Sequence, residues 1–195
     1  RQRQMCIRKR SDPIVGAGDL VIVISQSGET LDTMAALREA KKRGARILSI
    51  VNVVGSSIAR ESDDVLYTWA GPEIAVATTK AYSTQMVVLH LLGLYFGDVM
   101  GTVDLETYST MVRGIEALPG QMEQVLEHTE DIRAAAKWLA GEEDVFFLGR
   151  NLDYALSLEG SLKLKEISYI HSEAYAAGEL KHGTISLIEP GTLVI

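Results

Sequence analysis

The chain has almost no cysteine. Cys6 is the only one among 195 residues, which excludes an intrachain disulfide. A sequence without disulfides is typical of a reducing compartment, so we predict a cytoplasmic protein. Because no histidine lies near Cys6 in the sequence, we interpret it as an incidental thiol rather than a reactive one.

Long hydrophobic runs are also absent. The longest extends from Met86 to Gly97 and contains His90, and it is shorter than the roughly 18 apolar residues that cross a bilayer. No secretory signal is visible at the start of the sequence. With 47% apolar and 23% charged residues, the composition is that of a soluble globular protein with one large or two small domains. We therefore predict no membrane association.

Positive charge is scarce outside the first ten residues. The formal net charge is −7, and residues 1–10 contain five basic and no acidic residues. The rest of the chain therefore has 14 basic side chains against 26 acidic ones, and an acidic body repels nucleic-acid phosphates. We interpret residues 1–10 as a solvated leader or a junction, and we predict no nucleic-acid partner.

Strands and helices alternate in the first half of the sequence. Runs rich in Val, Ile and Leu predict three buried strands, at Asp19–Ser25, Ala45–Val51 and Asp64–Ala70. Helices are predicted over Thr30–Gly44, over residues 57–62, and over a long apolar segment that ends near Gly97. Strands separated by helices imply parallel pairing, so we predict an α/β fold with a doubly wound parallel sheet.

The second half begins with a helical stretch from Thr102 to about Ala140, which we expect to be broken at Leu118–Gly120. The elements predicted after it are a strand with a polar loop at Asp144–Asn151, a helix at Tyr154–Ile170 and a strand beginning at Thr192. We predict two domains, residues 1–102 and 103–195. The first would lack its start and the second would be truncated, so we expect exposed apolar surface.

The segment "SQSGET", Ser25–Thr30, joins the first predicted strand to its helix. Ligands of parallel α/β sheets bind at this edge, where a helix N-terminus offers N–H groups and partial positive charge. Ser25, Ser27 and Thr30 add hydroxyls, and Gly28 permits close backbone approach. The absence of Lys, Arg and the usual nucleotide-binding patterns argues against a nucleotide site. On these six residues alone, a phosphate site and a helix merely capped by Ser27 are equally supported.

Several longer motifs resemble one family. They are "SQSGETLDT", "GSSIARESD", "ATTKAYSTQ", "FLGRN" and "LEGSLKLKEISYIHSEAYAAGELKHG". Together they resemble the isomerase half of glutamine–fructose-6-phosphate aminotransferase, a pair of sugar-isomerase (SIS) domains. The resemblance extends from about Ser11 to Ile195, and it implies three-layer αβα domains with a phosphosugar site.

The resemblance also implies which residues hold the substrate. Four of them match the loop that binds the 6-phosphate of fructose 6-phosphate or glucosamine 6-phosphate: Ser25, Gln26, Ser27 and Thr30. Val76 and Thr78 match the second substrate loop, where Thr78 replaces the usual serine and keeps its hydroxyl. Ala75 replaces an expected glycine, which matters only if that position needs a positive φ.

Lys163 and Glu166 are three residues apart in a predicted helix and therefore project from neighbouring positions on one face. From the residues alone, a surface ion pair between Glu159 and Lys163 explains these charges better. The resemblance implies instead that Glu166 transfers a proton between C1 and C2, that Lys163 supports it electrostatically, and that His182 opens the sugar ring. In the family this histidine comes from the neighbouring subunit, so a homodimer is implied.

The other histidines are weaker candidates. We expect His171 at the end of the same helix, with at most a minor part in catalysis. We interpret His90 as a core residue of an apolar helix and His128 as a surface residue. No Cys, His and carboxylate cluster has metal-ligand spacing, and the implied chemistry needs no metal or other cofactor.

The implied function is the phosphosugar isomerase part of an aminotransferase that makes glucosamine 6-phosphate from fructose 6-phosphate and glutamine-derived ammonia. The glutaminase domain, the first SIS strand and the C-terminal tail of that enzyme have no counterpart in this sequence, so we expect the chain to be inactive alone. Two alternatives are a non-catalytic SIS module that senses phosphosugars and a related SIS isomerase or deglycase. The long last motif, with its carboxylate and histidine, favours the first interpretation.

Overall fold

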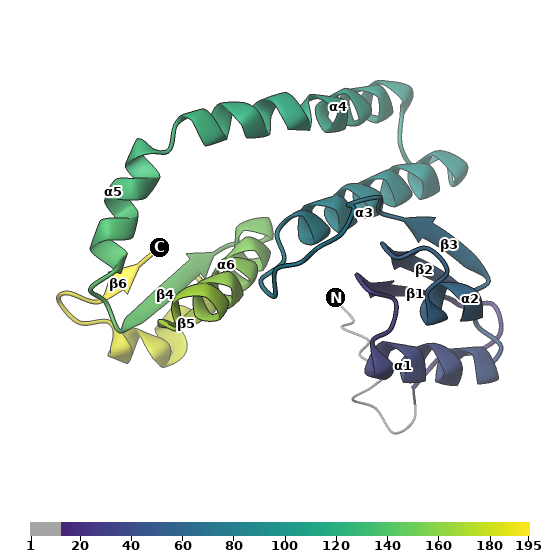
Figure 1. Ribbon diagram of the computed structural model, residues 1–195, viewed down its shortest axis with the longest axis horizontal. Helices are drawn as coiled ribbons and strands as arrows, with labels where there is room; N and C mark the ends of the chain where they lie inside the picture. The colour runs from purple at the N-terminus through teal and green to yellow at the C-terminus, as the bar shows by residue number, and fades with distance from the viewer. Residues whose placement is uncertain (1–12) are drawn as a thin grey trace. The chain divides into compact units, whose positions relative to one another are not determined.

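The computed structural model describes residues 13–195 and divides the chain into two compact units (Figure 1). The first unit ends at Glu116 and the second extends from Ala117 to Ile195, so the division falls within a helix. The predicted domain boundary at residues 102 and 103 stays a prediction. Cys6 and the basic segment at residues 1–10 lie outside the described residues.

The first unit contains a parallel three-stranded sheet. Its strands are β1 (Leu20–Ser25), β2 (Arg46–Val51) and β3 (Asp64–Tyr67), in the order β1-β2-β3. Helices α1 (Leu31–Lys42) and α2 (Ser57–Glu61) connect them, and this confirms the predicted alternation. Ser25 pairs with Val51 and Val51 with Tyr67, so the three strands end at the same edge of the sheet.

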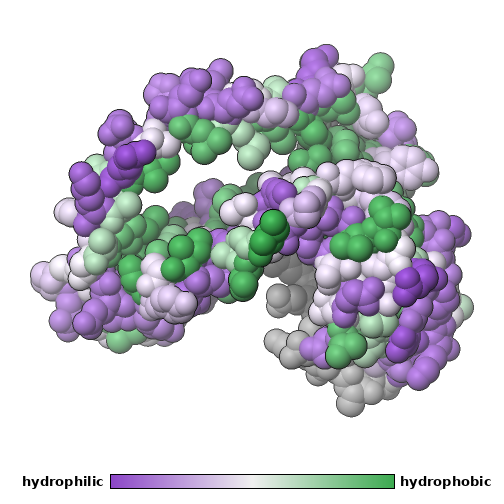
Figure 2. Space-filling view, viewed as in Figure 1, coloured by the Kyte–Doolittle hydropathy of each residue, from purple (hydrophilic) through white to green (hydrophobic). Residues whose placement is uncertain are grey.

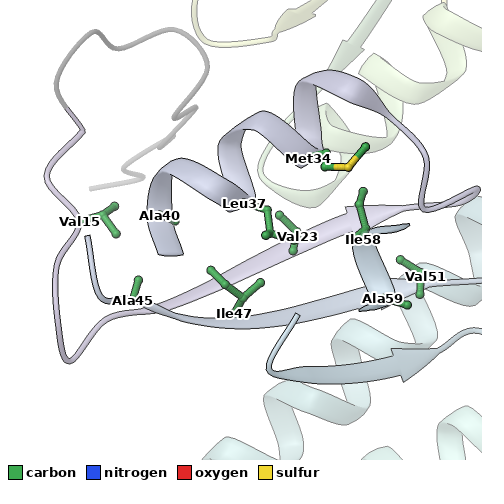
Figure 3. Packing of buried hydrophobic residues seen from close by; sticks show 10 residues of the cluster. All are labelled: Val15, Val23, Met34, Leu37, Ala40, Ala45, Ile47, Val51, Ile58 and Ala59. Carbon is green, nitrogen blue, oxygen red and sulfur yellow. The ribbon is translucent and has the colours of Figure 1, made fainter. Parts of the chain in front are cut away.

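The core of this unit lies between the sheet and the two connecting helices (Figure 3). Leu37 of α1, Ile47 of β2 and Ile58 of α2 are fully buried there. β1 alternates, because Val23 and Ser25 are buried while the neighbouring Ile22 and Ile24 stay partly exposed. Burial of each such large aliphatic side chain contributes about 1.5–3 kcal/mol, so this layer of packing holds the strand ends, and the loops that follow them, in place.

Helix α3 (Lys80–Val99) covers the opposite face of the same sheet, which confirms the three-layer arrangement for this unit (Figure 1). Side chains of α3 such as Leu92 and Phe96 line, together with Leu48 and Leu66 of the sheet, an apolar groove of about 820 Å³. The prediction that His90 is a core residue is wrong, since it is exposed on this helix. A helix that is hydrophobic on most sides can still turn one residue to solvent.

Two helices follow, α4 (Leu105–Glu127) and α5 (Glu130–Leu139). The predicted break at Leu118–Gly120 is wrong, because α4 continues through Pro119. An interior proline removes one backbone hydrogen bond and clashes with the carbonyl four residues before it, at a cost of about 3 kcal/mol, but its fixed φ is still helical. The 23-residue α4 continues past it. Figure 2 shows polar side chains along one side of both helices and hydrophobic ones along the other. No helix among residues 13–195 is long and apolar enough to cross a membrane.

The second unit contains another parallel sheet, with strand order β5-β4-β6. Its elements are β4 (Asp144–Gly149), α6 (Leu152–Ser168), β5 (His171–Ala176), the 3-10 helices η2 (Leu180–His182) and η3 (Thr184–Leu187), and β6 (Leu193–Val194). The predicted strands at the first and last of these positions are confirmed. The sequence did not predict β5, since its residues lack the β-branched side chains typical of strands.

His171 is therefore the first residue of β5 rather than the end of the helix, which corrects its expected position. α6 ends at Ser168, and Tyr169 after it adopts a left-handed φ of 64°. Such a residue reverses the chain direction and ends a helix. The turn lets His171 pair with Asp144 at the start of β4.

Candidate functional site

The loop Ser25–Thr30, here called the phosphate loop after the ligand that the family resemblance implies for it, connects β1 to α1 and is closed by its own hydroxyl groups. Ser25 Oγ lies 2.9 Å from Thr30 Oγ1, and it accepts a hydrogen bond of 3.0 Å from the backbone N–H of Gly28. Ser25 is buried at the end of β1, whereas Ser27 is exposed. The buried hydroxyl thus holds the loop in shape while the other hydroxyls border its outer surface.

Thr30, and not Ser27, is the N-cap of α1. The interpretation of Ser27 as a simple cap is wrong, because its hydroxyl accepts from Glu29 N–H at 3.2 Å. Within residues 13–195 the Thr30 side chain makes no capping bond either; its hydroxyl contacts Ser25. The start of α1 is therefore left without a side-chain cap, and such a start attracts anions through its backbone N–H groups and dipole.

Gly28 brings the phosphate loop against the start of α2. It has a φ of 67°, and a Cβ added there would overlap Ser56 Oγ. The Gly28 carbonyl accepts a 2.9 Å hydrogen bond from Ile58 N–H. Both the left-handed backbone and the close approach require glycine at this position.

Glu29 points to the same helix. Its Oε1 accepts a 2.8 Å hydrogen bond from Ser57 N–H, the first residue of α2. This bond from the Ser57 backbone, with the nearby Arg60 charge as a smaller cause, lowers the pKa of Glu29 below its ordinary value. The only carboxylate of the phosphate loop is thus used to cap α2 and fix the loop, a role that the sequence did not predict.

Two buried polar atoms at this site have no hydrogen-bond partner within the described residues, Gln26 Oε1 and Ser56 Oγ. Buried polar groups are nearly always satisfied in folded proteins. An unpaired acceptor and an unpaired hydroxyl beside an uncapped helix start are therefore favourable positions for the polar groups of a ligand or for ordered water. Gln26 is among the residues that the family resemblance implied, whereas Ser56 is not.

The second predicted substrate loop, residues 71–79, connects β3 to α3. Val76 is 94% exposed, and Thr78 makes no side-chain hydrogen bond within the described part of the chain. The structure does not bring these two side chains into contact with the phosphate loop. Ala75 is not among the residues with positive φ, so its replacement of a glycine causes no backbone strain.

In the second unit, Lys163 contacts both acidic candidates on α6. Its Nζ lies 2.6 Å from Glu166 Oε2 and 3.7 Å from Glu159 Oε1. The hydrogen bond to Glu166 raises the pKa of Lys163 above its ordinary value. The closer pair, Lys163 with Glu166, is thus the one implied by the family resemblance. The pair favoured by spacing alone, Lys163 with Glu159, is the more distant one. Because only 22–31% of these side chains is exposed, both contacts are partly shielded from water.

α6 is held against the sheet by small residues. A Cβ added at Gly149, at the end of β4, would overlap the backbone of Asp153, and one at Gly160 would press on the Phe147 ring. The absence of these Cβ atoms lets the helix lie close to β4. This fixes the rotation of α6 and therefore the side on which Lys163 and Glu166 project.

His182 ends the 3-10 helix η2 and is exposed. Its backbone N–H donates to Glu179 O at 3.0 Å, but its imidazole has no hydrogen-bond partner among residues 13–195. The second unit by itself does not bring His182 into contact with Lys163 or Glu166. The described residues therefore contain all three predicted catalytic side chains but join only two of them.

A sequence profile of the SIS domain matches residues 7–95 and 139–195, which is most of the chain. The chain belongs to the SIS domain family. The glutamine–fructose-6-phosphate aminotransferase of Clostridium tetani is 61% identical to this SIS chain over 184 residues, which are 94% of the chain and 30% of that protein. The chain thus spans less than a third of the length of such curated relatives.

Solved structures agree with this placement. The C-terminal domain of glucosamine-fructose-6-phosphate aminotransferase from Francisella tularensis matches with a TM-score of 0.91 and 39% identity, covering 96% of this chain and 53% of that one. A glucosamine-6-phosphate deaminase from Thermotoga maritima matches with a TM-score of 0.69 and 28% identity, covering 96% and 54%. The predicted resemblance to the isomerase part of the aminotransferases is confirmed.

The remaining histidines of the SIS chain differ in their surroundings. His171 Nδ1 lies 2.6 Å from Asp144 Oδ1, and its Nε2 lies 3.8 Å from Glu173 Oε1. These groups are well exposed, so the pairing is a surface contact of small energetic value. His128 is exposed at the end of α4, as predicted, with its Nδ1 2.9 Å from Gln124 O.

Proposed function

We propose that this SIS chain binds fructose 6-phosphate and glucosamine 6-phosphate as the isomerase part of a glutamine–fructose-6-phosphate aminotransferase. The observation that carries the proposal is the phosphate loop, whose hydroxyls border a helix start without a side-chain cap. The 6-phosphate would accept hydrogen bonds from Ser27 and Thr30 hydroxyls and from the first backbone N–H groups of α1. Because the loop contains no Lys or Arg, the phosphate would be held by neutral donors.

The reaction would take place at the sugar carbons next to the carbonyl. The Glu166 carboxylate takes a proton from C1 of the open-chain ketose and returns it to C2. Lys163, 2.6 Å from Glu166, supplies positive charge where the enediolate oxygen becomes negative. His182 transfers the proton that opens the ring, and it acts from the second subunit of a homodimer. The lack of any His182 contact to Glu166 within the described residues is compatible with that assignment. No cofactor takes part.

Further parts of the proposal rest on the aminotransferases that the chain resembles. The complete enzyme would work in the cytoplasm and would contain a glutaminase domain that supplies ammonia, so that the product is glucosamine 6-phosphate. Val76 and Thr78 would contact the sugar from the loop at residues 71–79. The first and second domains would comprise residues 1–102 and 103–195, and this chain would bind substrate without turnover.

The proposal is tested by titrating the chain with fructose 6-phosphate and glucosamine 6-phosphate, observed by heteronuclear NMR. Inorganic phosphate and unphosphorylated fructose serve as ligand controls. We expect saturable binding of both sugar phosphates, weakened about tenfold in Ser27→Ala by the loss of a hydrogen bond to a charged group. Ser109→Ala on α4 is the matched control and should bind normally. Absence of binding at millimolar ligand would contradict the proposal.

The catalytic part needs a separate measurement, the conversion of fructose 6-phosphate to glucose 6-phosphate. We expect none from this chain. Conversion that disappears in Glu166→Gln and persists in Glu159→Gln would overturn the proposed inactivity and support the role of Glu166. The deaminase among the structural matches favours one further assay, release of ammonia from glucosamine 6-phosphate, which would identify a related phosphosugar enzyme instead.

A further inference from the structure

Asn52, the first residue after β2, connects the ends of all three strands of the first unit. Its backbone N–H donates to Gln26 O at 3.2 Å, within the phosphate loop. Its side-chain Nδ2 donates to Gly71 O at 2.7 Å. Its Oδ1 accepts from Thr68 Oγ1 at 3.1 Å and from Ala70 N–H at 2.8 Å. One residue thus bonds to the loop after β1 and to the chain after β3.

The segment that Asn52 holds contains a strained residue. Trp69 has a φ of 54°, although it is neither glycine nor asparagine, and its side chain is 75% exposed. A bulky residue in this conformation costs of order 1–3 kcal/mol unless its surroundings enforce it. The residues on either side of Trp69, Thr68 and Ala70, both donate to the same Asn52 oxygen. These bonds enforce the turn and explain why β3 ends at Tyr67 rather than at Ala70 as predicted.

The turn decides where the loop at residues 71–79 begins. Beyond Gly71 the loop is largely exposed. It leads into α3, whose second residue, Ala81, donates its N–H to Glu73 Oε2 at 3.3 Å. The Asn52 side chain therefore provides the contact that ties the start of this loop to the edge of the sheet. The phosphate loop is attached to Asn52 through backbone atoms alone.

We propose that Asn52 is a positioning residue that sets the spacing between the phosphate loop and the loop at residues 71–79. This rests on the proposed function, in which a phosphosugar contacts the first loop with its phosphate and the second with its sugar. A ligand that spans both loops binds well when their separation is already correct, because no ordering has to accompany binding. Inorganic phosphate needs the first loop alone.

Two substitutions of Asn52 separate its contacts with the chain after β3 from its contact with the phosphate loop. Asn52→Ala removes all three side-chain hydrogen bonds to the chain after β3 but keeps the backbone bond to Gln26. Asn52→Asp keeps the oxygen that accepts from Thr68 and Ala70 and loses the donor to Gly71. Its added charge acts on phosphate and on sugar phosphate alike, so the ratio of the two affinities still reports on the spacing of the loops.

The experiment measures dissociation constants for fructose 6-phosphate and inorganic phosphate by NMR titration of the 195-residue chain. In Asn52→Ala we expect fructose 6-phosphate binding to weaken about tenfold relative to phosphate binding, with a smaller change in Asn52→Asp. Ile47→Val is the control for general destabilisation, since Ile47 is fully buried in the same sheet and touches neither loop. It should leave the ratio unchanged.

Amide hydrogen exchange tests the same proposal without any ligand. We expect amides of residues 70–79 to exchange about tenfold faster in Asn52→Ala than in the wild type, with those of residues 26–30 unchanged. Equal acceleration across the unit, or an unchanged affinity ratio in the folded Ala variant, would overturn the proposal. If the wild type binds neither ligand, the proposed function fails for this chain. The exchange experiment still tests Asn52: faster exchange confined to residues 70–79 in Asn52→Ala supports its positioning role, and no acceleration there contradicts it.

Discussion

Ser161 and Ser172 exchange hydrogen bonds between α6 and β5. Their hydroxyl oxygens lie 3.0 Å apart, Ser161 Oγ lies 3.1 Å from Ser172 O, and Ser172 Oγ lies 2.9 Å from Ser161 O. Because each hydroxyl has one proton, two of these three contacts are hydrogen bonds at any one time. Both residues are almost completely buried. Because Lys163 and Glu166 follow Ser161 by two and five residues on α6, this pair fixes the helix that carries two of the proposed catalytic side chains.

The first prediction concerns the coupling of these serines. Ser161→Ala and Ser172→Ala should each lower the free energy of unfolding by about 1 kcal/mol, since each removes buried hydrogen bonds. The double variant should cost less than the sum, because the contact between the two hydroxyls is already lost in either single variant. Urea denaturation of the four proteins gives the coupling energy. Strict additivity would show that the two hydroxyls act independently.

Gly28→Ala should destabilise the protein and disrupt the phosphate loop. A left-handed backbone costs alanine about 1–2 kcal/mol, and the added methyl group would overlap Ser56 Oγ. Adding Ser56→Gly to this variant should restore the stability lost through the steric overlap, but not the stability lost through the left-handed backbone. Gly114→Ala on α4, where a Cβ meets open space, is the control and should stabilise by up to about 1 kcal/mol. Thermal unfolding and phosphate titration measure both effects, and an unchanged loop in Gly28→Ala would contradict the assignment.

The contribution of Glu29 to stability should depend on pH. The Ser57 N–H bond lowers its pKa below the ordinary value of 4.5, so the unfolded chain binds more protons than the folded one in acid. The stabilisation is therefore complete above about pH 5 and is lost as the pH falls through the lowered pKa. Thermal unfolding of wild type and Glu29→Gln between about pH 3 and pH 7 checks this. Their difference should grow with pH and then level off, and a difference independent of pH would refute it.

The pKa of Lys163 should show which carboxylate is its main partner. Since the hydrogen bond to Glu166 is the main cause of its raised pKa, Glu166→Gln should bring that pKa down toward its ordinary value. Glu159→Gln, which removes a contact of 3.7 Å rather than 2.6 Å, should have a smaller effect. NMR titration of the Lys163 side chain in the alkaline range measures both. The stability due to this pair is present below the ordinary lysine pKa and is lost as the pH rises through the raised one. A larger shift in Glu159→Gln would reverse the assignment.

Patterns of neighbouring residues in the sequence predicted many of the secondary-structure elements of this protein. Val- and Ile-rich runs predicted β1, β2 and the start of β3, and the segment from Ser25 to Thr30 predicted the phosphate loop at the edge of the sheet. Spacing places Lys163 and Glu166 on one face of a helix, but spacing alone favoured Glu159 as the partner of Lys163, and the family resemblance was needed to single out Glu166. These features depend on local periodicity and on contacts between residues a few positions apart. Both can be recognised in the sequence without knowledge of the fold.

Tertiary structure decided the rest. β5 has weak strand propensity and exists because its backbone pairs with β4. Glu29 caps a helix 28 positions later, and Asn52 joins residues from Gln26 to Gly71. Such hydrogen bonds join segments next to strand ends, which come together only when the sheet assembles. Local sequence patterns therefore do not predict them. The sequence by itself determined most of the helices and strands, the family resemblance and the candidate residues, whereas the assembled sheet decided which side chains support the loops, since parallel pairing brings distant strand ends to one edge.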